Sequence, residues 1–411
     1  MDLNYPPDAE DFRIEVRAWL ARTLPAGWGH RGSALAEPDR EQFIHEWPSL
    51  LAAPGWRCPS WPTEYGGAGL SLIECVVLEE ELARVGAPED PFPVGAMIVG
   101  PTIMHWGTPA QKQYFLPEIA RGTIAWCQGF SEPDAGSDLA SLRTTAVLTG
   151  DEWLLNGQKI WTSRAHAADY AFVLARTDPA APSHAGLSYL LVPMGQLGIE
   201  IRPIVQIDGS ADFNEVFFSD ARCPADNVVG GVNNGWKVAM TTLGFERGAA
   251  STTSHRRFAD ELDDVLELAR TAGLAGDPLF RQRWARQWSR VQILRFNGLR
   301  VLADLLHGGR QGATVGPISK IAWSETHRDT LDLALDVLGA EALVLAGGAT
   351  ADRLDRRRGM RRYPVSPVQS TFFFSRSTTI WGGTSEIQRN IVAERVLGLP
   401  KEPRPQLSRT E

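Results

Sequence analysis

Residues 128–138 read Gln128-Gly129-Phe130-Ser131-Glu132-Pro133-Asp134-Ala135-Gly136-Ser137-Asp138, and they stand where the pattern of the chain changes. Before them, apolar residues recur mostly at helical spacing; after them come short segments rich in β-forming residues. Gly136 and its small neighbours would let a ligand approach the backbone, and Ser131 and Ser137 would supply hydroxyl donors. The same residues could equally form a capped turn without a ligand.

The segments that follow are separated by Gly, Pro, Asn and Asp turns, a pattern typical of an antiparallel sheet or barrel. We predict a central antiparallel β-barrel domain. Its expected strands lie at 144–149, 152–155, 159–163, 170–175, 187–192, 199–204 and 215–218.

Helical patterns lie on both sides of this β region. Ser71, with Glu74 three residues later, predicts a capping box at the start of a helix over 70–85, and the Pro- and Gly-rich stretch 55–67 predicts an ordered loop. Long helical patterns return after Asn234, including 291–306 and 331–338, the second ending near Gly339. We therefore predict an α+β multidomain protein with a helical domain at 1–122, a β domain at 123–231 and a helical bundle at 232–411.

Composition excludes several classes of function. The 411 residues carry 41 Lys and Arg against 49 Asp and Glu, a net charge of −8, which argues against a nucleic-acid binder and an electrostatic membrane anchor. We find neither a signal-peptide pattern nor a run of 18 apolar residues. The four cysteines form no CxxC pair, which argues against a zinc site and a disulfide framework. A cytoplasmic location is the expectation.

Several common motifs are missing. There is no GxGxxG opening a βα unit, no GxxxxGK[ST], no GxSxG and no HExxH, and the eight histidines lack metal-ligand spacing, so we predict no metal site. Two runs of arginine stand out, each either a solvated surface or a phosphate contact. They comprise Arg281, Arg283, Arg286, Arg290, Arg295 and Arg300, and Arg353, Arg356, Arg357, Arg358, Arg361 and Arg362.

A second segment that could bind a ligand reads Trp381-Gly382-Gly383-Thr384-Ser385-Glu386-Ile387-Gln388-Arg389-Asn390-Ile391. A Gly pair followed by Thr384 predicts the start of a helix, whose free N–H groups suit an oxygen anion or a phosphate. On its own this segment could also be an ordinary N-cap.

Together, these segments resemble the acyl-CoA dehydrogenase family of flavoproteins. The likeness covers the chain in six motifs, in the family's order. They are Trp61-Pro62-Thr63-Glu64-Tyr65-Gly66-Gly67, Ser131 to Asp138, Asn156-Gly157-Gln158-Lys159-Ile160-Trp161-Thr162-Ser163, Asn214-Glu215-Val216-Phe217-Phe218, Asp226-Asn227-Val228-Val229-Gly230 and Gly383-Thr384-Ser385-Glu386-Ile387-Gln388-Arg389. The family fold has an N-terminal helical domain, a central β domain and a C-terminal four-helix bundle.

The resemblance implies a bound FAD and an acyl-CoA substrate. By matching positions, Gln128, Phe130 and Ser131 would line the isoalloxazine, Trp161 would pack against it, and Ser163 would donate a hydrogen bond near N5. Gly136 and Ser137 match contacts to the cofactor and the CoA arm, and Thr384 and Glu386 match the segment that reaches the FAD dinucleotide. The cofactor would carry the redox chemistry while the protein orients the reactants.

The resemblance also implies where the catalytic base lies. Many family members carry a Glu immediately before the Gly-Thr of the C-terminal motif, and here that position is Gly382. A minority carry the Glu on the first helix of the C-terminal domain, just before an Arg, as in Glu246-Arg247 here. We therefore predict Glu246 as the base, Arg247 as a substrate-binding neighbour and the Gly382 N–H as a donor to the thioester oxygen. Glu246 simply paired with an Arg is the alternative.

Two family runs that reach a neighbouring subunit's FAD are replaced. Arg-x-x-Phe-Gly appears as Arg281-Gln282-Arg283-Trp284-Ala285-Arg286-Gln287, and Gln-x-x-Gly-Gly appears as Asp336-Val337-Leu338-Gly339-Ala340. Similar departures occur in α2β2 steroid-side-chain enzymes of actinobacteria. The resemblance thus implies a homotetramer or a heterotetramer, with an electron-transferring flavoprotein as acceptor. A non-catalytic partner subunit and a flavin monooxygenase or oxidase are the rival functions.

Overall fold

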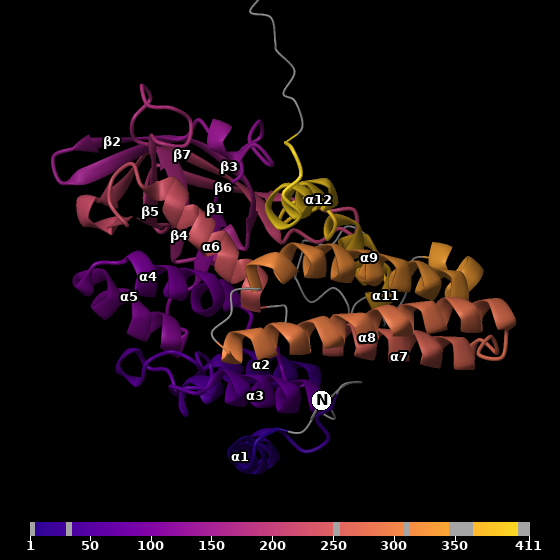
Figure 1. Ribbon diagram of the computed structural model, residues 1–411. Helices are drawn as coiled ribbons and strands as arrows, with labels where there is room; N and C mark the ends of the chain where they lie inside the picture. The colour runs from indigo at the N-terminus through magenta and orange to yellow at the C-terminus, as the bar shows by residue number, and fades with distance from the viewer. Residues whose placement is uncertain (1–4, 30–34, 250–254, 308–311, 345–364, 402–411) are drawn as a thin grey trace, which may run out of the picture.

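The computed structural model describes residues 5–29, 35–249, 255–307, 312–344 and 365–401, except the side chains of residues 37, 246–249, 305 and 312–314. A helical N-terminal unit lies on one side of a β-sheet, and a bundle of long helices lies beside both (Figure 1). The predicted order of helices, sheet and helices is confirmed. The division at residues 122 and 231 stays a prediction.

The N-terminal unit begins its third helix with the predicted capping box. The Ser71 hydroxyl accepts from the Glu74 N–H at 3.3 Å, and the Glu74 carboxylate accepts from the Ser71 N–H at 2.7 Å. The stretch 55–67 consists of turns around one short 3-10 helix, η1 (Thr63–Tyr65), as expected for an ordered loop. The helices are α1 (Pro7–Thr23), α2 (Glu37–Ala52), α3 (Leu72–Arg84), α4 (Gly100–Trp106) and α5 (Pro109–Arg121).

Eight strands form one sheet in the middle of the chain. They are β1 (Trp126–Gly129), β2 (Thr145–Thr149), β3 (Glu152–Ser163), β4 (Tyr170–Arg176), β5 (Leu187–Pro193), β6 (Ile199–Ile204), β7 (Phe213–Pro224) and β8 (Val228–Val229). Each predicted strand lies within one of these, except that the strand predicted at 144–149 begins one residue before β2.

The predicted closed barrel is wrong, because the sheet is open. Neighbouring strands follow the order β6-β7-β3-β2-β4-β5-β8, and no described pairing joins the two ends of that order. Most pairs are antiparallel as expected, but β1 and β2 each run parallel to β4. The last strand, β8, has only two residues and pairs with β5 alone, so it ends the sheet instead of closing it. Turn signals along the chain cannot reveal either feature, because both depend on which distant strands meet.

The two predicted strands on either side of Asn156-Gly157 are one continuous strand, β3. The Asn156 side chain bonds to Asp220 in β7, where a register irregularity lies between Leu155 and Gly157. Gly157 has φ 149°, and a Cβ there would lie 2.6 Å from the Thr144 hydroxyl oxygen. This Asn-Gly pair therefore serves a bulge and a close strand contact, and not a hairpin turn.

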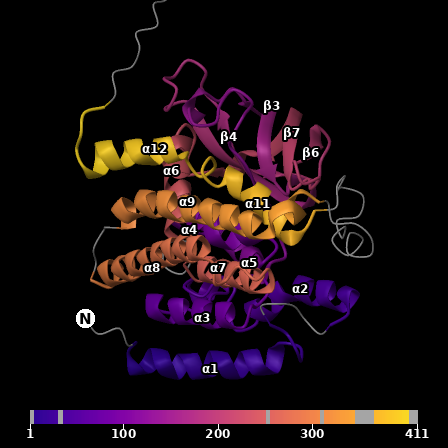
Figure 2. The same cartoon turned by 90° about the vertical axis from the view of Figure 1, so that its right-hand side faces the viewer.

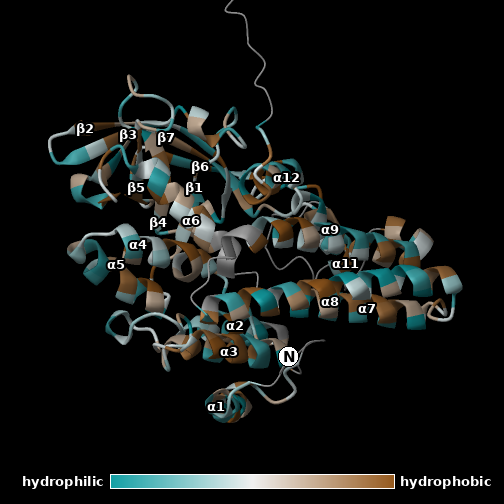
Figure 3. Cartoon of the chain, viewed as in Figure 1, coloured by the Kyte–Doolittle hydropathy of each residue, from teal (hydrophilic) through white to brown (hydrophobic). Residues whose placement is uncertain are grey.

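The C-terminal helices form the expected bundle. In Figures 1 and 2, α8 and α9 run side by side, with α7 and α11 packed against α9. Figure 3 shows brown and teal residues alternating along α8 and α9, as in amphipathic helices that bury one face. The helices are α6 (Gly235–Ala249), α7 (His255–Thr271), α8 (Pro278–Leu306), α9 (Gly312–Leu338), α11 (Pro367–Ser377) and α12 (Ser385–Ile391), which continues as the π-helical turn η7 (Val392–Val396).

One of the hydrophobic clusters joins the N-terminal unit, the sheet and α6. Ile103 and Phe115 from the N-terminal helices, Trp126 and Phe172 from the sheet, and Val238 from α6 all belong to it, and each is buried. The sheet is therefore fixed against both helical units, and the segments at their junction have defined relative positions.

Candidate active site

The segment at the end of β1 is anchored by one aromatic ring. Phe130 is buried, and its ring meets the rings of Phe172 and Tyr189 edge to face, at 5.5 and 6.1 Å between centroids. Gln128 and Ser131 on either side are half-buried. The anchor leaves these two polar side chains partly accessible beside a fixed backbone.

The turn that follows leaves room at Gly136. Glu132 and Ala135 exchange two backbone hydrogen bonds, at 3.0 and 3.1 Å, which close the turn. Gly136 and Ser137 are exposed, and a Cβ added at Gly136 would meet no protein atom within 4 Å. The protein's own packing therefore does not require a glycine here, which is what close approach of a ligand would explain.

Trp161 holds an unusual conformation in β3. Its φ is 59°, in the left-handed region that bulky residues rarely adopt, and its side chain is 57% exposed. A register irregularity between Lys159 and Thr162 accompanies it, and Ser163 is exposed two residues further on. Backbone strain of this kind costs about 1–3 kcal/mol and tends to occur at functional sites.

Two hydrogen bonds bring the β1 and β3 segments together. The Ile160 N–H donates to the Ser131 carbonyl at 2.9 Å, and the Lys159 ammonium donates to the Phe130 carbonyl at 3.0 Å. Phe130 and Ser131 therefore lie beside the strand that carries Trp161. Of the predicted cofactor contacts, these are the ones that the structure places as neighbours.

The Gly-Gly-Thr turn starts a helix as predicted. The Thr384 hydroxyl accepts from the Ile387 N–H at 3.1 Å and caps α12, while the Gln388 amide donates to the Gly382 carbonyl at 2.9 Å. Gly382 has φ 65°, so the backbone favours glycine at this position. A backbone N–H and the Thr384 hydroxyl bond to the exposed Glu386 carboxylate and lower its pKa.

This turn is not bonded to the other two segments in the part of the chain that the structure describes. Among the described residues, no hydrogen bond or ion pair joins 382–386 to 128–137 or to 161–163. In Figures 1 and 2, α12 lies along α9, on the same side of that helix as the sheet. The three segments of the candidate site therefore come from the sheet and from the C-terminal helices.

Glu246 and Arg247 lie in the last turn of α6, and their side chains fall outside what the structure describes. Helix α6 packs against β5 at one end of its length and against α9 in the bundle. The backbone of position 246 therefore lies on the element that joins the sheet to the bundle (Figure 1).

The sequence reading missed Lys159 and Glu132 as a pair. Lys159 is fully buried, and its ammonium lies 2.8 Å from a Glu132 carboxylate oxygen. Strand alternation places Lys159 on the same face as Trp153 and Leu155, which are buried, and a charged residue on a buried face needs a partner. That signal was available, although it does not identify the partner.

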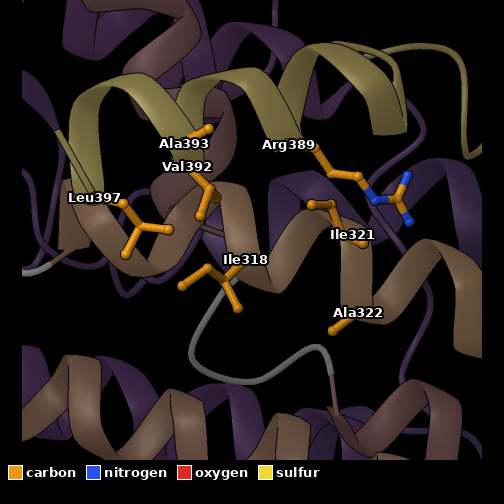
Figure 4. Close-up of a pocket in the computed structure, with 7 residues that line it drawn as sticks. All are labelled: Ile318, Ile321, Ala322, Arg389, Val392, Ala393 and Leu397. Atoms are coloured by element: carbon orange, nitrogen blue, oxygen red, sulfur yellow. The ribbon is translucent and has the colours of Figure 1, made fainter. Parts of the chain in front are cut away.

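A separate apolar cavity of about 330 Å³ lies between α9 and α12 (Figure 4). None of the predicted site residues lines it. Its one charged lining side chain, Arg389, pairs with Glu325 at 2.5 Å. It is lined by Ile318, Ile321, Ala322, Arg389, Val392, Ala393 and Leu397.

The remaining candidates concern charge. Within the described ranges, no three His, Cys, Asp or Glu side chains gather as metal ligands. Of the first arginine run, Arg283 pairs with Asp336 and Arg290 with Asp329. The second run, at 353–362, lies outside the described residues.

In the described part of the chain, no helix has the length and apolar character needed to cross a membrane.

The chain matches three family models in succession. They are described as "Acyl-CoA dehydrogenase, N-terminal domain" over residues 6–123, "Acyl-CoA dehydrogenase, middle domain" over 127–221 and "Acyl-CoA dehydrogenase, C-terminal domain" over 233–397. A similar curated protein is "Acyl-CoA dehydrogenase IpdE1" of Mycobacterium tuberculosis. It is 46% identical over 404 residues, which are 96% of this chain and 99% of that protein.

Two of the similar solved structures have names that mention two proteins each. "Tcur3481-Tcur3483 steroid ACAD" is 33% identical with a TM-score of 0.78, covering 98% of this chain and 100% of that one. "Crystal structure of the ChsE4-ChsE5 complex from Mycobacterium tuberculosis" is 31% identical with a TM-score of 0.78, again covering 98% and 100%.

Proposed function

The chain belongs to the acyl-CoA dehydrogenase family, and on that premise we propose that it forms a trans-2-enoyl-CoA from an acyl-CoA thioester, with Glu246 as the base. FAD, when bound, accepts the hydride that leaves the β-carbon. The chain's own residues bind and orient the reactants and remove the α-proton. The observation that carries the proposal is the adjacency of the Phe130–Ser131 backbone to the strand of Trp161.

The residues at this junction fit an FAD. The Trp161 indole is a large exposed ring, Ser163 is exposed two residues along the same strand, and a Cβ at Gly136 would meet no protein atom within 4 Å. We propose that Gln128, Phe130, Ser131, Trp161 and Ser163 hold the ring system of the cofactor. Gly136 and Ser137 would contact the cofactor and the CoA arm, and Thr384 and Glu386 the dinucleotide.

Gly382 supports the choice of Glu246 as the base. Gly382 has no side chain, and its φ of 65° favours glycine, so the carboxylate comes from another element. Glu246, on the helix that joins sheet and bundle, supplies one. A carboxylate enclosed by substrate and cofactor is a stronger base than one in water. Arg247 would contact the substrate beside it.

The N–H of Gly382 is available to the thioester oxygen. It donates to no residue that the structure describes, and Gly382 is half-buried. A donor aimed at this oxygen would stabilise the negative charge that develops when Glu246 takes the α-proton. Because the glycine retains the N–H, only the side chain of the usual residue is lost at this position.

For the acyl group we propose a ring-bearing, steroid-derived class. The likeness to the structure named as a steroid ACAD supports this, at 33% identity over nearly the whole chain. Trp381, which precedes Gly382, is 40% exposed, and its ring centroid lies 5.5 Å from that of Trp323. These two rings offer a broad aromatic surface next to Gly382, where we propose that the thioester binds. Rates of bound-flavin bleaching with steroid-derived, branched and straight-chain acyl-CoA esters would test the class.

The same measurement tests the function itself. Anaerobic bleaching of the flavin by an acyl-CoA, with the electrons passed to an electron-transferring flavoprotein, is the expected result. Oxygen consumption with a substrate that lacks CoA would identify a monooxygenase or oxidase instead. A colourless protein that neither binds FAD nor reacts alone or with a partner would be a non-catalytic subunit.

We further propose that the outer face of α8 docks a second subunit of different sequence, in a heterotetramer rather than a homotetramer. Trp288, Ile293 and Phe296 on this face are 49%, 53% and 51% exposed. Arg286 and Arg295 among them pair with no described acid, and α8 contains no Asp or Glu between Pro278 and Ala303. Two copies meeting through this face would oppose like charges, whereas an acidic rim on another chain would be complementary.

A further inference from the structure

Lys159 is a buried charge with every donor in use. Its ammonium donates to the Phe130 carbonyl at 3.0 Å, to the Leu174 carbonyl at 2.8 Å and to a Glu132 oxygen at 2.8 Å. Three protons therefore meet three acceptors, and the side chain has no exposed surface. Such an arrangement has little freedom to move.

Glu132 is equally committed. Besides Lys159, its carboxylate accepts from the Arg143 N–H at 2.6 Å and from the Thr144 N–H at 2.9 Å. Burial by itself would raise the pKa of Glu132, but the Lys159 ammonium and these N–H donors together hold it below its ordinary value. Burial lowers the pKa of Lys159, and the Glu132 carboxylate limits that fall. The pair is ionised and fixed from both sides.

The Lys159–Glu132 pair lies between the end of β1 and strand β3. Through Phe130 and Glu132 it fixes the end of β1 and the turn that leads to Gly136 and Ser137. Lys159 also lies two residues before Trp161, and its neighbour Ile160 bonds to the Ser131 carbonyl. One buried ion pair thus sets the relative position of two segments that would face one cofactor, without being exposed to that cofactor itself.

We propose that Lys159, held by Glu132, is a positioning residue for FAD: it orients the Phe130–Ser131 backbone relative to Trp161 so that both segments contact the same ring system. This inference rests on the proposed function. It predicts that loss of the charge pair weakens FAD binding and changes the environment of the bound flavin, even where the apoprotein stays folded.

The test uses the full chain with and without FAD. Lys159→Met leaves the Glu132 charge buried without its cation, so the informative variant is Lys159→Met with Glu132→Gln, which removes both charges. The matched control is Arg222→Met, which breaks the exposed Arg222–Glu152 pair, 2.6 Å long, between β7 and β3 of the same sheet. The measurements are circular dichroism and melting of the apoprotein, the FAD dissociation constant by fluorescence titration, and the visible spectrum of bound flavin.

We expect the double variant to fold, to bind FAD at least tenfold more weakly than wild type and to show a shifted flavin absorption band. Once saturated with FAD, it should lose kcat with little change in KM for the acyl-CoA. The Arg222→Met control should match wild type in every readout.

A folded double variant with the wild-type dissociation constant and spectrum would overturn the inference. So would failure of both Lys159 variants to fold while the control folds, because the pair would then serve the whole domain and not the cofactor site. If the wild-type chain itself bound no FAD, the proposed function would fail instead, so the two failures are distinguishable.

Discussion

The indole of Trp161 meets the ring of Phe213 edge to face, with 6.2 Å between the centroids and 78° between the planes. This contact braces an indole that is mostly exposed and whose own backbone is strained at φ 59°. An aromatic ring held in this way is poorly explained by the stability of the protein, and it is well suited to pack against a planar ligand.

Trp161→Gly should therefore separate stability from binding. Glycine tolerates φ 59°, so relief of strain should offset the loss of the exposed ring, and the apoprotein should unfold within about 1 kcal/mol of wild type. FAD should bind much more weakly. Chemical denaturation and FAD titration check the two parts. A loss of several kcal/mol in the apoprotein would show that Trp161 is a structural residue, and Trp153→Gly, at a buried tryptophan of the same strand, is the control for that outcome.

Glu246→Gln should leave FAD binding intact and slow flavin reduction by acyl-CoA at least a hundredfold, the effect expected on losing a general base. Stopped-flow absorbance under anaerobic conditions measures the rate. In the control variant Glu341→Gln, at an exposed residue of η6 (Gly339–Leu343), the flavin should be reduced at the wild-type rate. If the flavin of Glu246→Gln were reduced at the wild-type rate, the assignment of the base would be refuted.

Glu81 should make the N-terminal unit sensitive to acid. Its buried carboxylate bonds to Arg13 at 2.8 Å, Arg17 at 2.9 Å and Arg84 at 2.5 Å. Burial opposes ionisation, but these guanidinium groups prevail and lower the pKa from 4.5 to about 2. The stabilisation is therefore complete above pH 4.5 and is lost as the pH falls toward about 2.

Glu81→Gln should accordingly cost about 3 kcal/mol at neutral pH, because it leaves guanidinium groups without their buried partner. The difference from wild type should shrink steadily below pH 4.5. Chemical denaturation followed by tryptophan fluorescence measures the difference, and the N-terminal unit contributes Trp19 and Trp47, whose ring centroids lie 5.6 Å apart. A difference that did not change with pH would contradict the assignment.

Trp288→Asp should abolish docking of the second subunit on α8 without affecting the fold, because Trp288 is 49% exposed in this chain. Light scattering of the chain purified with a co-expressed partner measures the assembly. Ser289→Asp, one residue along and also exposed, tests whether a new charge alone causes the effect. A homotetramer formed by the wild-type chain alone would refute the proposed heteromeric docking.

Much of the fold could be predicted from the sequence wherever the signal is local. The Ser71–Glu74 capping box and the Thr384 cap each depend on side chains within three residues of the N–H groups they bond. Strand β6 was predicted with its observed bounds at 199–204, because apolar and polar residues alternate along it and turn residues lie directly beside it. The family, and through it the expected roles of Glu246 and Trp161, followed from motifs that are themselves contiguous.

Only the tertiary structure decided what depends on distant partners. The open sheet, the parallel pairing of β1 with β4 and the continuity of β3 through Asn156 arise from contacts between strands far apart in the sequence. The same holds for Lys159 and Glu132, which are 27 residues apart and meet only when the turn after β1 packs against β3. A buried charge can be suspected from alternation along one strand. Its partner, and so its effect on the site, is set by the free energy of burying both charges together.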